Sequence, residues 1–144
     1  AHLAQSLRLP GRSSHVYARG TRWLLDAAIS REGVESALEN ARHTGRFDDA
    51  HTLVCMPDIK DIRSILTLLD RDRTILATTH EDHLFFDNYP DDWEVMPLTE
   101  ALPAIQRRSR EVIALGTMSF AAEMAAYLGL DTETWIDPWA QAQK

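Results

Sequence analysis

The sequence predicts an α/β fold, in which helices cover both faces of a mainly parallel sheet of about six strands and form a three-layer sandwich. Short apolar runs alternate with segments whose apolar residues recur at helical spacing, and this alternation repeats four times after an opening hairpin. The continuous apolar run at 52–56 is typical of a parallel strand that is covered on both faces. The 144 residues suit one domain, 1–144, with a tail at 131–144 that has no clear period.

The hydrophobic pattern places the elements in order along the chain. A hairpin is expected from 15–18 and 23–25, and the remaining strands at 52–56, 74–79, 93–98 and 111–116. Helices are expected at 31–43, 62–69, 99–108 and 119–128. Right-handed crossovers would then place helices on both faces of the sheet.

Capping residues set the expected ends of these helices. Ser30 stands at the N-cap position of the first helix, and Gly45 follows its last apolar residue. Either Asp58 or Asp61 is expected to cap the second helix, Thr99 the third and Ser119 the fourth. Pro103 is tolerable in the third helix only if it lies in the first turn.

Composition excludes several classes of protein. A formal net charge of −7 gives the chain no electrostatic reason to bind nucleic acid or an anionic membrane. The single cysteine, Cys55, lies in an apolar run and is expected to be a small core residue, which fits a cytoplasmic protein. No stretch resembles a membrane span or a signal peptide. The start at Ala1 rather than Met fits a processed product or a piece of a longer chain.

The turn after the strand at 23–25 is the candidate ligand-binding corner. The strand ends in Asp26, three small or apolar residues follow, and a helix begins after Ser30. This arrangement places a carboxylate and free backbone N–H groups at the edge of the sheet where α/β domains bind ligands. Asp26 could equally cap the helix, since a carboxylate is favoured at the positive helix end. Both interpretations remain open from the sequence.

Four short motifs, in order, resemble the C-terminal domain of the Mur ligase superfamily, and folylpolyglutamate synthase/dihydrofolate synthase in particular. Residues 9–12 read Leu-Pro-Gly-Arg, as in the family. Residues 26–30 stand where the family has Asp-Gly-Ala-His-Asn, and 56–62 resemble a loop that ends in Asp-Lys-Asp. Residues 115–118, Leu-Gly-Thr-Met, stand where the family has Thr-Gly-Ser-Leu. The resemblance spans 9–130.

This resemblance implies a Rossmann-like domain of a three-domain, ATP-dependent amide ligase that adds glutamate to a folate or pteroate carboxylate. The complete enzyme would use ATP and Mg²⁺, neither of which this domain would bind alone. Its partner would be an upstream P-loop domain, because no Gly-x-x-x-x-Gly-Lys-Ser/Thr motif occurs in this chain. The C-terminal domain would present the amino acid and close the ATP site.

The resemblance also implies roles for individual residues. Arg12, Asp26 and Lys60 would bind the nucleotide, and Asp26 would also act in catalysis through ATP, metal or the incoming glutamate. Thr117 would replace a serine that holds the amino acid, and Ser30 would lie in the same substrate site. Plainer roles are also open to three of them: a surface ion pair for Arg12, a solvated loop position for Lys60, and a helix cap for Thr117.

Two departures from the family pattern leave alternatives open. Ile29 and Ser30 stand where the family has His and Asn, and the side chain of Ile29 cannot donate a hydrogen bond to a phosphate or carboxylate. The chain could therefore be a degenerate, non-catalytic Rossmann-like module that binds a ligand or a partner. It could also belong to a Mur-type ligase for another acceptor. No metal site is expected, since His80 and His83 lack a third ligand in the sequence.

Overall fold

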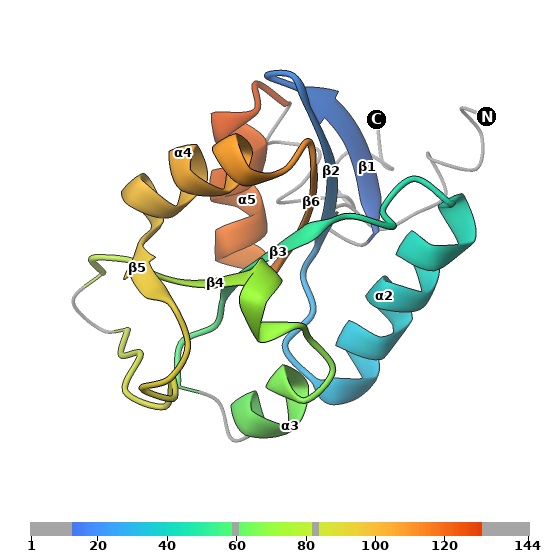
Figure 1. Cartoon of the computed structure of the whole chain (residues 1–144). Coiled ribbons are helices and arrows are strands. Elements are labelled where there is room, and N and C mark those ends of the chain that lie inside the picture. The colour runs from blue at the N-terminus through green and yellow to red at the C-terminus, as the bar shows by residue number, and fades with distance from the viewer. Residues whose placement is uncertain (1–12, 59–60, 82–83, 131–144) are drawn as a thin grey trace, which may run out of the picture.

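The computed structural model describes residues 13–58, 61–81 and 84–130 and joins their strands into one sheet. Within these residues the strand order is β1-β2-β6-β3-β4-β5 (Figure 1). β1 and β2 form an antiparallel hairpin, and the other neighbouring strands pair in parallel. The strands are β1 (Ser14–Ala18), β2 (Thr21–Asp26), β3 (His51–Cys55), β4 (Thr74–Thr78), β5 (Val95–Pro97) and β6 (Glu111–Gly116). The predicted α/β class with an N-terminal hairpin is confirmed.

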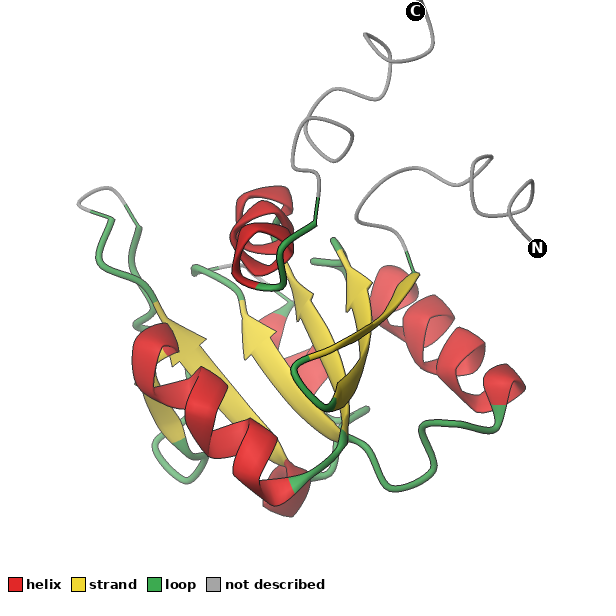
Figure 2. Cartoon of the chain, turned by 90° about the horizontal axis from the view of Figure 1, so that it is seen from above, coloured by secondary structure: helices red, strands yellow, loops and turns green. Residues whose placement is uncertain are grey.

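Helices cover both faces of the sheet, and strands lie side by side between them (Figure 2). One face packs against α4 (Leu98–Arg108) and α5 (Met118–Tyr127). The other face packs against α2 (Arg31–Thr44) and α3 (Ile62–Leu66). A single 3₁₀ turn, η1 (Arg71–Arg73), leads into β4. This is the three-layer sandwich expected from the sequence.

The sheet separates two apolar cores, because successive side chains of a strand point to opposite faces. Trp23 and Leu25 pack toward α4 and α5, whereas Leu24 between them packs toward α2. All three side chains are almost fully buried. The central strands are continuous apolar runs for this reason: neither face is exposed to water.

Helix α2 follows the sequence prediction closely. Ser30 is its N-cap, and the Ser30 side chain accepts a hydrogen bond from the backbone N–H of Gly33 at 3.1 Å. Gly45 ends the helix in the left-handed region, with φ of 66°. The residues buried on its inner face are Val34, Ala37 and Ala41, which share one helical stripe.

Two helices start earlier than predicted. Thr117, not Ser119, is the N-cap of α5, and its hydroxyl accepts the N–H of Phe120 at 3.2 Å. Helix α4 starts directly after Pro97, so Thr99 lies inside the first turn instead of capping it. In both cases the helix starts sooner after its strand than the hydrophobic pattern indicated: α4 follows β5 directly, and only Thr117 separates β6 from α5.

Pro103 lies in the interior of α4 rather than in its first turn. The proline is exposed, so water can solvate the carbonyl that would otherwise accept from the missing N–H. Helix α3 is also shorter than expected and has Asp61 at its N-cap without a side-chain bond. Asp58 instead accepts from the backbone N–H of Asn88 at 2.7 Å.

In the part of the chain that the structure describes, no helix combines the length and the apolar character needed to cross a membrane.

Candidate functional site

The candidate site lies where the parallel strands end. Asp26 at the end of β2 is paired in register with Leu115 of β6, and Gly116 of β6 is paired with Cys55 of β3. Helix α2 leaves β2 toward one face of the sheet, whereas α5 leaves β6 toward the other. Neighbouring strands whose helices diverge create a crevice, and open α/β sheets bind ligands at such crevices.

Asp26 stands at this crevice but is already engaged by protein groups. The side chain is 6% exposed, and its Oδ2 atom accepts from the backbone N–H of Ser13 at 3.0 Å and from the Ser13 hydroxyl at 2.8 Å. The carboxylate thus anchors the segment that enters β1. The N-cap of α2 is Ser30, so Asp26 does not occupy the capping position that was its alternative role.

Ser30 and Thr117 occupy matching positions on the two sides of the crevice. Each is an N-cap whose side-chain oxygen accepts a backbone N–H, from Gly33 and from Phe120 respectively. A hydroxyl that accepts in this way still has its own O–H to donate. The two helix N-termini also carry partial positive charge, which suits a carboxylate or a phosphate. The structure therefore brings the predicted residues Asp26, Ser30 and Thr117 to one edge.

Apolar side chains share this edge with the polar ones. Ile29 is 46% exposed and Met118 is 43% exposed, and they follow β2 and β6 respectively. Phe85 is also exposed, and its carbonyl accepts from the N–H of Asp58 beyond β3. None of these side chains can hydrogen-bond to a ligand, so recognition at this edge depends on the hydroxyls, the carboxylate and the backbone.

Arg12 and Lys60 lie outside the described residues, as do His83 and the whole motif at 9–12. Their predicted roles in nucleotide binding stay predictions. Within 13–58, 61–81 and 84–130, no group of three or more His, Cys, Asp or Glu side chains is placed to hold a metal ion.

A small hollow beside Thr117 was not foreseen from the sequence. It is lined by polar and apolar groups at the ends of β3 and β4 and along the first two turns of α5: Cys55, Pro57, Thr79, Glu81, Leu84, Phe86, Thr117, Ser119, Phe120 and Glu123. Glu81 was expected in an exposed polar loop, and nothing in the local sequence marks Glu123. Glu81 follows β4, and Glu123 lies on the helix that follows β6. Strands β4 and β6 are the two neighbours of β3, so their carboxyl ends lie close together on one edge of the sheet.

The cysteine on this hollow is protected from reaction. Burial, with added repulsion from Glu123 and Glu81, raises the pKa of the Cys55 thiol to about 12. Only the thiolate reacts with alkylating agents. We therefore expect iodoacetamide at pH 8 to modify native Cys55 at least about a hundredfold more slowly than the guanidinium-unfolded chain. Mass spectrometry can follow the single cysteine; similar rates in both states would contradict the buried placement.

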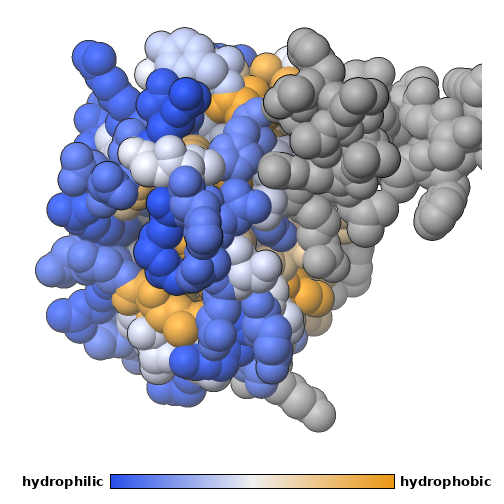
Figure 3. Space-filling view, turned by 90° about the vertical axis from the view of Figure 1, so that its right-hand side faces the viewer, coloured by the Kyte–Doolittle hydropathy of each residue, from blue (hydrophilic) through white to orange (hydrophobic). Residues whose placement is uncertain are grey.

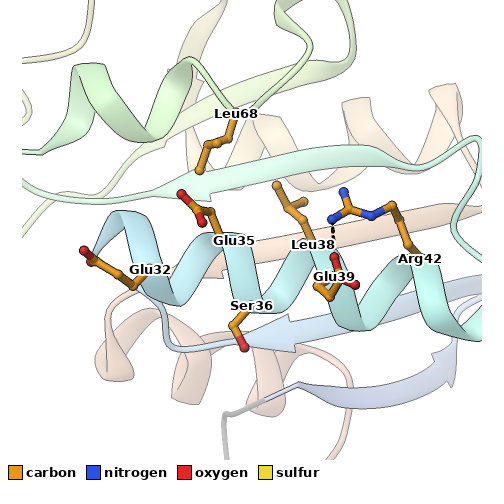
Figure 4. A pocket seen from close by; sticks show the side chains of 7 residues that line it. All are labelled: Glu32, Glu35, Ser36, Leu38, Glu39, Arg42 and Leu68. Atoms are coloured by element: carbon orange, nitrogen blue, oxygen red, sulfur yellow. Dashed lines mark hydrogen bonds and ion pairs between the residues drawn. The ribbon is translucent and has the colours of Figure 1, made fainter.

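A larger groove along α2 is a solvated surface. Its lining comprises Glu32, Glu35, Ser36, Leu38, Glu39, Arg42 and Leu68, and the Glu39 carboxylate pairs with Arg42 across one helical turn (Figure 4). The side of the molecule on which α2 lies is mostly hydrophilic, with small apolar patches (Figure 3). Glu35 pairs in the same way with Arg31, and exposed pairs of this kind are common on helix surfaces, so this groove provides no further reason for a site.

Comparison with known proteins supports one relationship. No family model and no curated protein sequence matches the chain. Two solved structures do: folylpolyglutamate synthase from Thermotoga maritima, with 20% identity and a TM-score of 0.63, and Mycobacterium tuberculosis folylpolyglutamate synthase complexed with ADP and AMPPCP, with 19% identity and a TM-score of 0.59. They cover 89% and 86% of this chain, which spans only 33% of each of them. The fold resemblance expected from the four motifs is confirmed: this chain has the fold of about one third of folylpolyglutamate synthase.

Proposed function

We propose that the chain is the domain that presents the amino acid and closes the ATP site in an ATP-dependent amide ligase similar to folylpolyglutamate synthase. One observation carries this proposal. Two helix N-termini, capped by Ser30 and Thr117, flank Asp26 at the crevice between β2 and β6. That crevice belongs to a fold that makes up about one third of each of two folylpolyglutamate synthase structures. One of these structures is a complex with ADP and AMPPCP.

In this function the edge would bind and orient the substrates rather than perform covalent chemistry itself. Ser30, Thr117 and their helix N-termini suit the carboxylate of an amino acid. Arg12 and Lys60 would contact the nucleotide phosphates, and the acceptor would be a folate or pteroate carboxylate. When bound, ATP supplies the phosphate that activates this carboxylate toward the amine.

Asp26 could provide one oxygen ligand to Mg²⁺, which prefers carboxylates and phosphates. The described residues offer no set of three ligands, and the Asp26 carboxylate already accepts two hydrogen bonds from Ser13. The remaining ligands would have to come from the nucleotide and from a nucleotide-binding domain. Such a division of the site fits a domain that acts only within a longer protein.

The test uses this chain joined to the nucleotide-binding part of its own protein, with phosphate release as the signal. Thr117→Ala should lower kcat/KM for the amino acid roughly tenfold or more, the loss expected for one hydrogen bond to a charged group. KM for ATP should change little. Thr117→Ser keeps the hydroxyl and should restore activity.

Thr99→Ala is the matched control, because Thr99 is exposed within α4 and caps no helix. Thr117→Ala also removes the cap of α5, which should lower the free energy of unfolding by about 1 kcal/mol. Thermal unfolding of each variant measures this loss of stability separately from the loss of substrate binding. Phosphate release that never depends on an amino acid would reject the proposal. Substituting other carboxylate acceptors, such as a peptidoglycan precursor, would show whether the acceptor is a folate.

Ile29 favours a second candidate, a Rossmann-like module that binds a ligand or partner without catalysis. Its exposed side chain stands where the resembling family has a histidine, next to the crevice and on the same edge as Met118. Ile29→His separates the two functions. In a ligase the imidazole should raise amino-acid-dependent phosphate release, whereas a binding module should release no phosphate with either residue.

A further inference from the structure

The hollow beside Thr117 is lined by two carboxyl groups. Glu81 follows β4 and Glu123 lies on α5, and both belong to its lining. Partial burial raises the pKa of Glu123, and the nearby carboxyl group of Glu81 raises it further. Two carboxylates in one small hollow repel each other, so a proton shared by the pair is favoured.

A third oxygen in the same hollow lacks a partner among the described residues. The Oγ1 atom of Thr79 is shielded from solvent and makes no hydrogen bond to any of their groups. Thr79 follows β4 directly and lines the hollow with Glu81 and Glu123. A shielded hydroxyl without a partner is unfavourable, and few are found in folded proteins. This atom points to a missing hydrogen-bond partner independently of the two acids, and a hydroxyl oxygen can accept from a donor.

We propose that this hollow binds a primary ammonium group. Its three N–H donors match the three oxygens offered by Glu81, Glu123 and Thr79, and its positive charge takes the place of the shared proton.

The size and the walls of the hollow fit this ligand. Its free space is about 10 Å³, which is enough for one group of the size of a water molecule. An ammonium group has that size, whereas a guanidinium or a phosphate is larger. Apolar side chains of the lining, among them Leu84, Phe86 and Phe120, can pack against the methylene groups that carry the amine.

This inference rests on the proposed function and specifies how its amino acid is held. Thr117 belongs both to the hollow and to the N-terminus of α5. An amino acid could thus place a carboxylate at the helix N-terminus and an ammonium against the acid pair, which matches its two charges. The side-chain ammonium of a diamino acid could stay in the hollow throughout the reaction. An α-ammonium bound there would have to give its proton to the acid pair and leave the hollow before its nitrogen could attack the activated carboxylate.

Binding to the full 144-residue chain tests the site directly, with heteronuclear NMR titrations at constant ionic strength. Nε-acetyl-L-lysine offers only the α-ammonium, and Nα-acetyl-L-lysine offers only the side-chain ammonium. We expect at least one of them to bind, with shifts at Thr79 and Thr117. Glu123→Gln should weaken that binding at least fivefold. The variant should fold, because it removes a charge repulsion, and Glu100→Gln on α4 is the matched control.

The pH dependence gives an independent readout. Because the ammonium replaces a proton, affinity should rise as pH increases through the pKa of Glu123, and Glu123→Gln should abolish this rise. Glu81 is the titratable group that acts on Glu123 among the described residues, and the nearby Cys55 thiol stays protonated over this range. Equal binding to wild type and Glu123→Gln, or no binding of either lysine derivative, would overturn the inference.

The two proposals can fail separately. If the hollow binds an ammonium but the longer protein never releases phosphate in response to an amino acid, the proposed ligase function fails and the ammonium site stands. If phosphate release with glutamate or lysine occurs and is unaffected by Glu123→Gln, the ligase function stands and the ammonium site is rejected.

Discussion

Replacing Gly116 by alanine is expected to lower the free energy of unfolding by about 3 kcal/mol, the upper part of the range for overpacking a core. A Cβ atom at Gly116 would lie 2.5 Å from the carbonyl oxygen of Cys55 and 2.5 Å from Cδ2 of Phe120. The first neighbour is backbone of the adjacent strand β3, and the second is a buried ring of α5. Neither can move without separating strands or displacing the helix.

Urea denaturation of the purified chain measures this loss, and Gly20→Ala is the control. Gly20 lies in the β1–β2 turn at φ of 74°, and a Cβ atom there would have no neighbour within 4 Å, so alanine should cost about 1 kcal/mol from backbone strain alone. If Gly116→Ala lowers the free energy of unfolding no more than Gly20→Ala does, α5 does not pack so closely on the end of β6. Because Thr117 follows Gly116, the same variant should also disturb the candidate site.

Tyr89→Phe is expected to lower the free energy of unfolding by about 2 kcal/mol, although it removes only one oxygen. The Tyr89 hydroxyl accepts from the backbone N–H of Met56 at 3.0 Å and donates to the carbonyl of Ala77 at 2.8 Å. It therefore links the ends of β3 and β4 from a loop that crosses them. Burial raises the pKa of this hydroxyl, so it remains a donor at all physiological pH values. Phenylalanine would leave both backbone groups buried without their partner.

Tyr17→Phe provides the control for this prediction. Tyr17 is 71% exposed on β1, and its substitution should change stability by less than about 0.5 kcal/mol. Hydrogen exchange adds a local readout, since the amide of Met56 should lose protection in Tyr89→Phe. Equal stability of the two variants would mean that water can replace the tyrosine hydroxyl at this position.

The order of the elements and the ends of α2 could be predicted because they depend on local sequence. Ser30 and Gly45 act within one turn of the helix that they cap, and the apolar runs of β3 and β6 report burial on both faces. The caps of α4 and α5 lie two residues earlier than Thr99 and Ser119, which are also good capping residues. The choice between neighbouring capping candidates depends on how soon the chain turns into the helix after each strand, and the local sequence does not show this.

The candidate site depended more on contacts between distant parts of the chain. The motifs led to Asp26, Ser30 and Thr117, and the structure brings all three to one edge. The bond from Ser13 to Asp26 and the contact between Glu81 and Glu123 had no sequence signal. Neither contact produces a periodicity or a motif, since each joins segments that only the sheet places together.

By itself, the sequence determined the α/β class, the succession of strands and helices, and the location of a ligand-binding corner after β2. These features follow from hydrophobic period and capping, which act over a few residues. The tertiary structure alone decided that β6 inserts between β2 and β3. That insertion sets Thr117 beside Asp26 and closes the acid-lined hollow. Strand order depends on how crossover helices pack on the two faces, and this packing energy is shared among residues far apart in the chain.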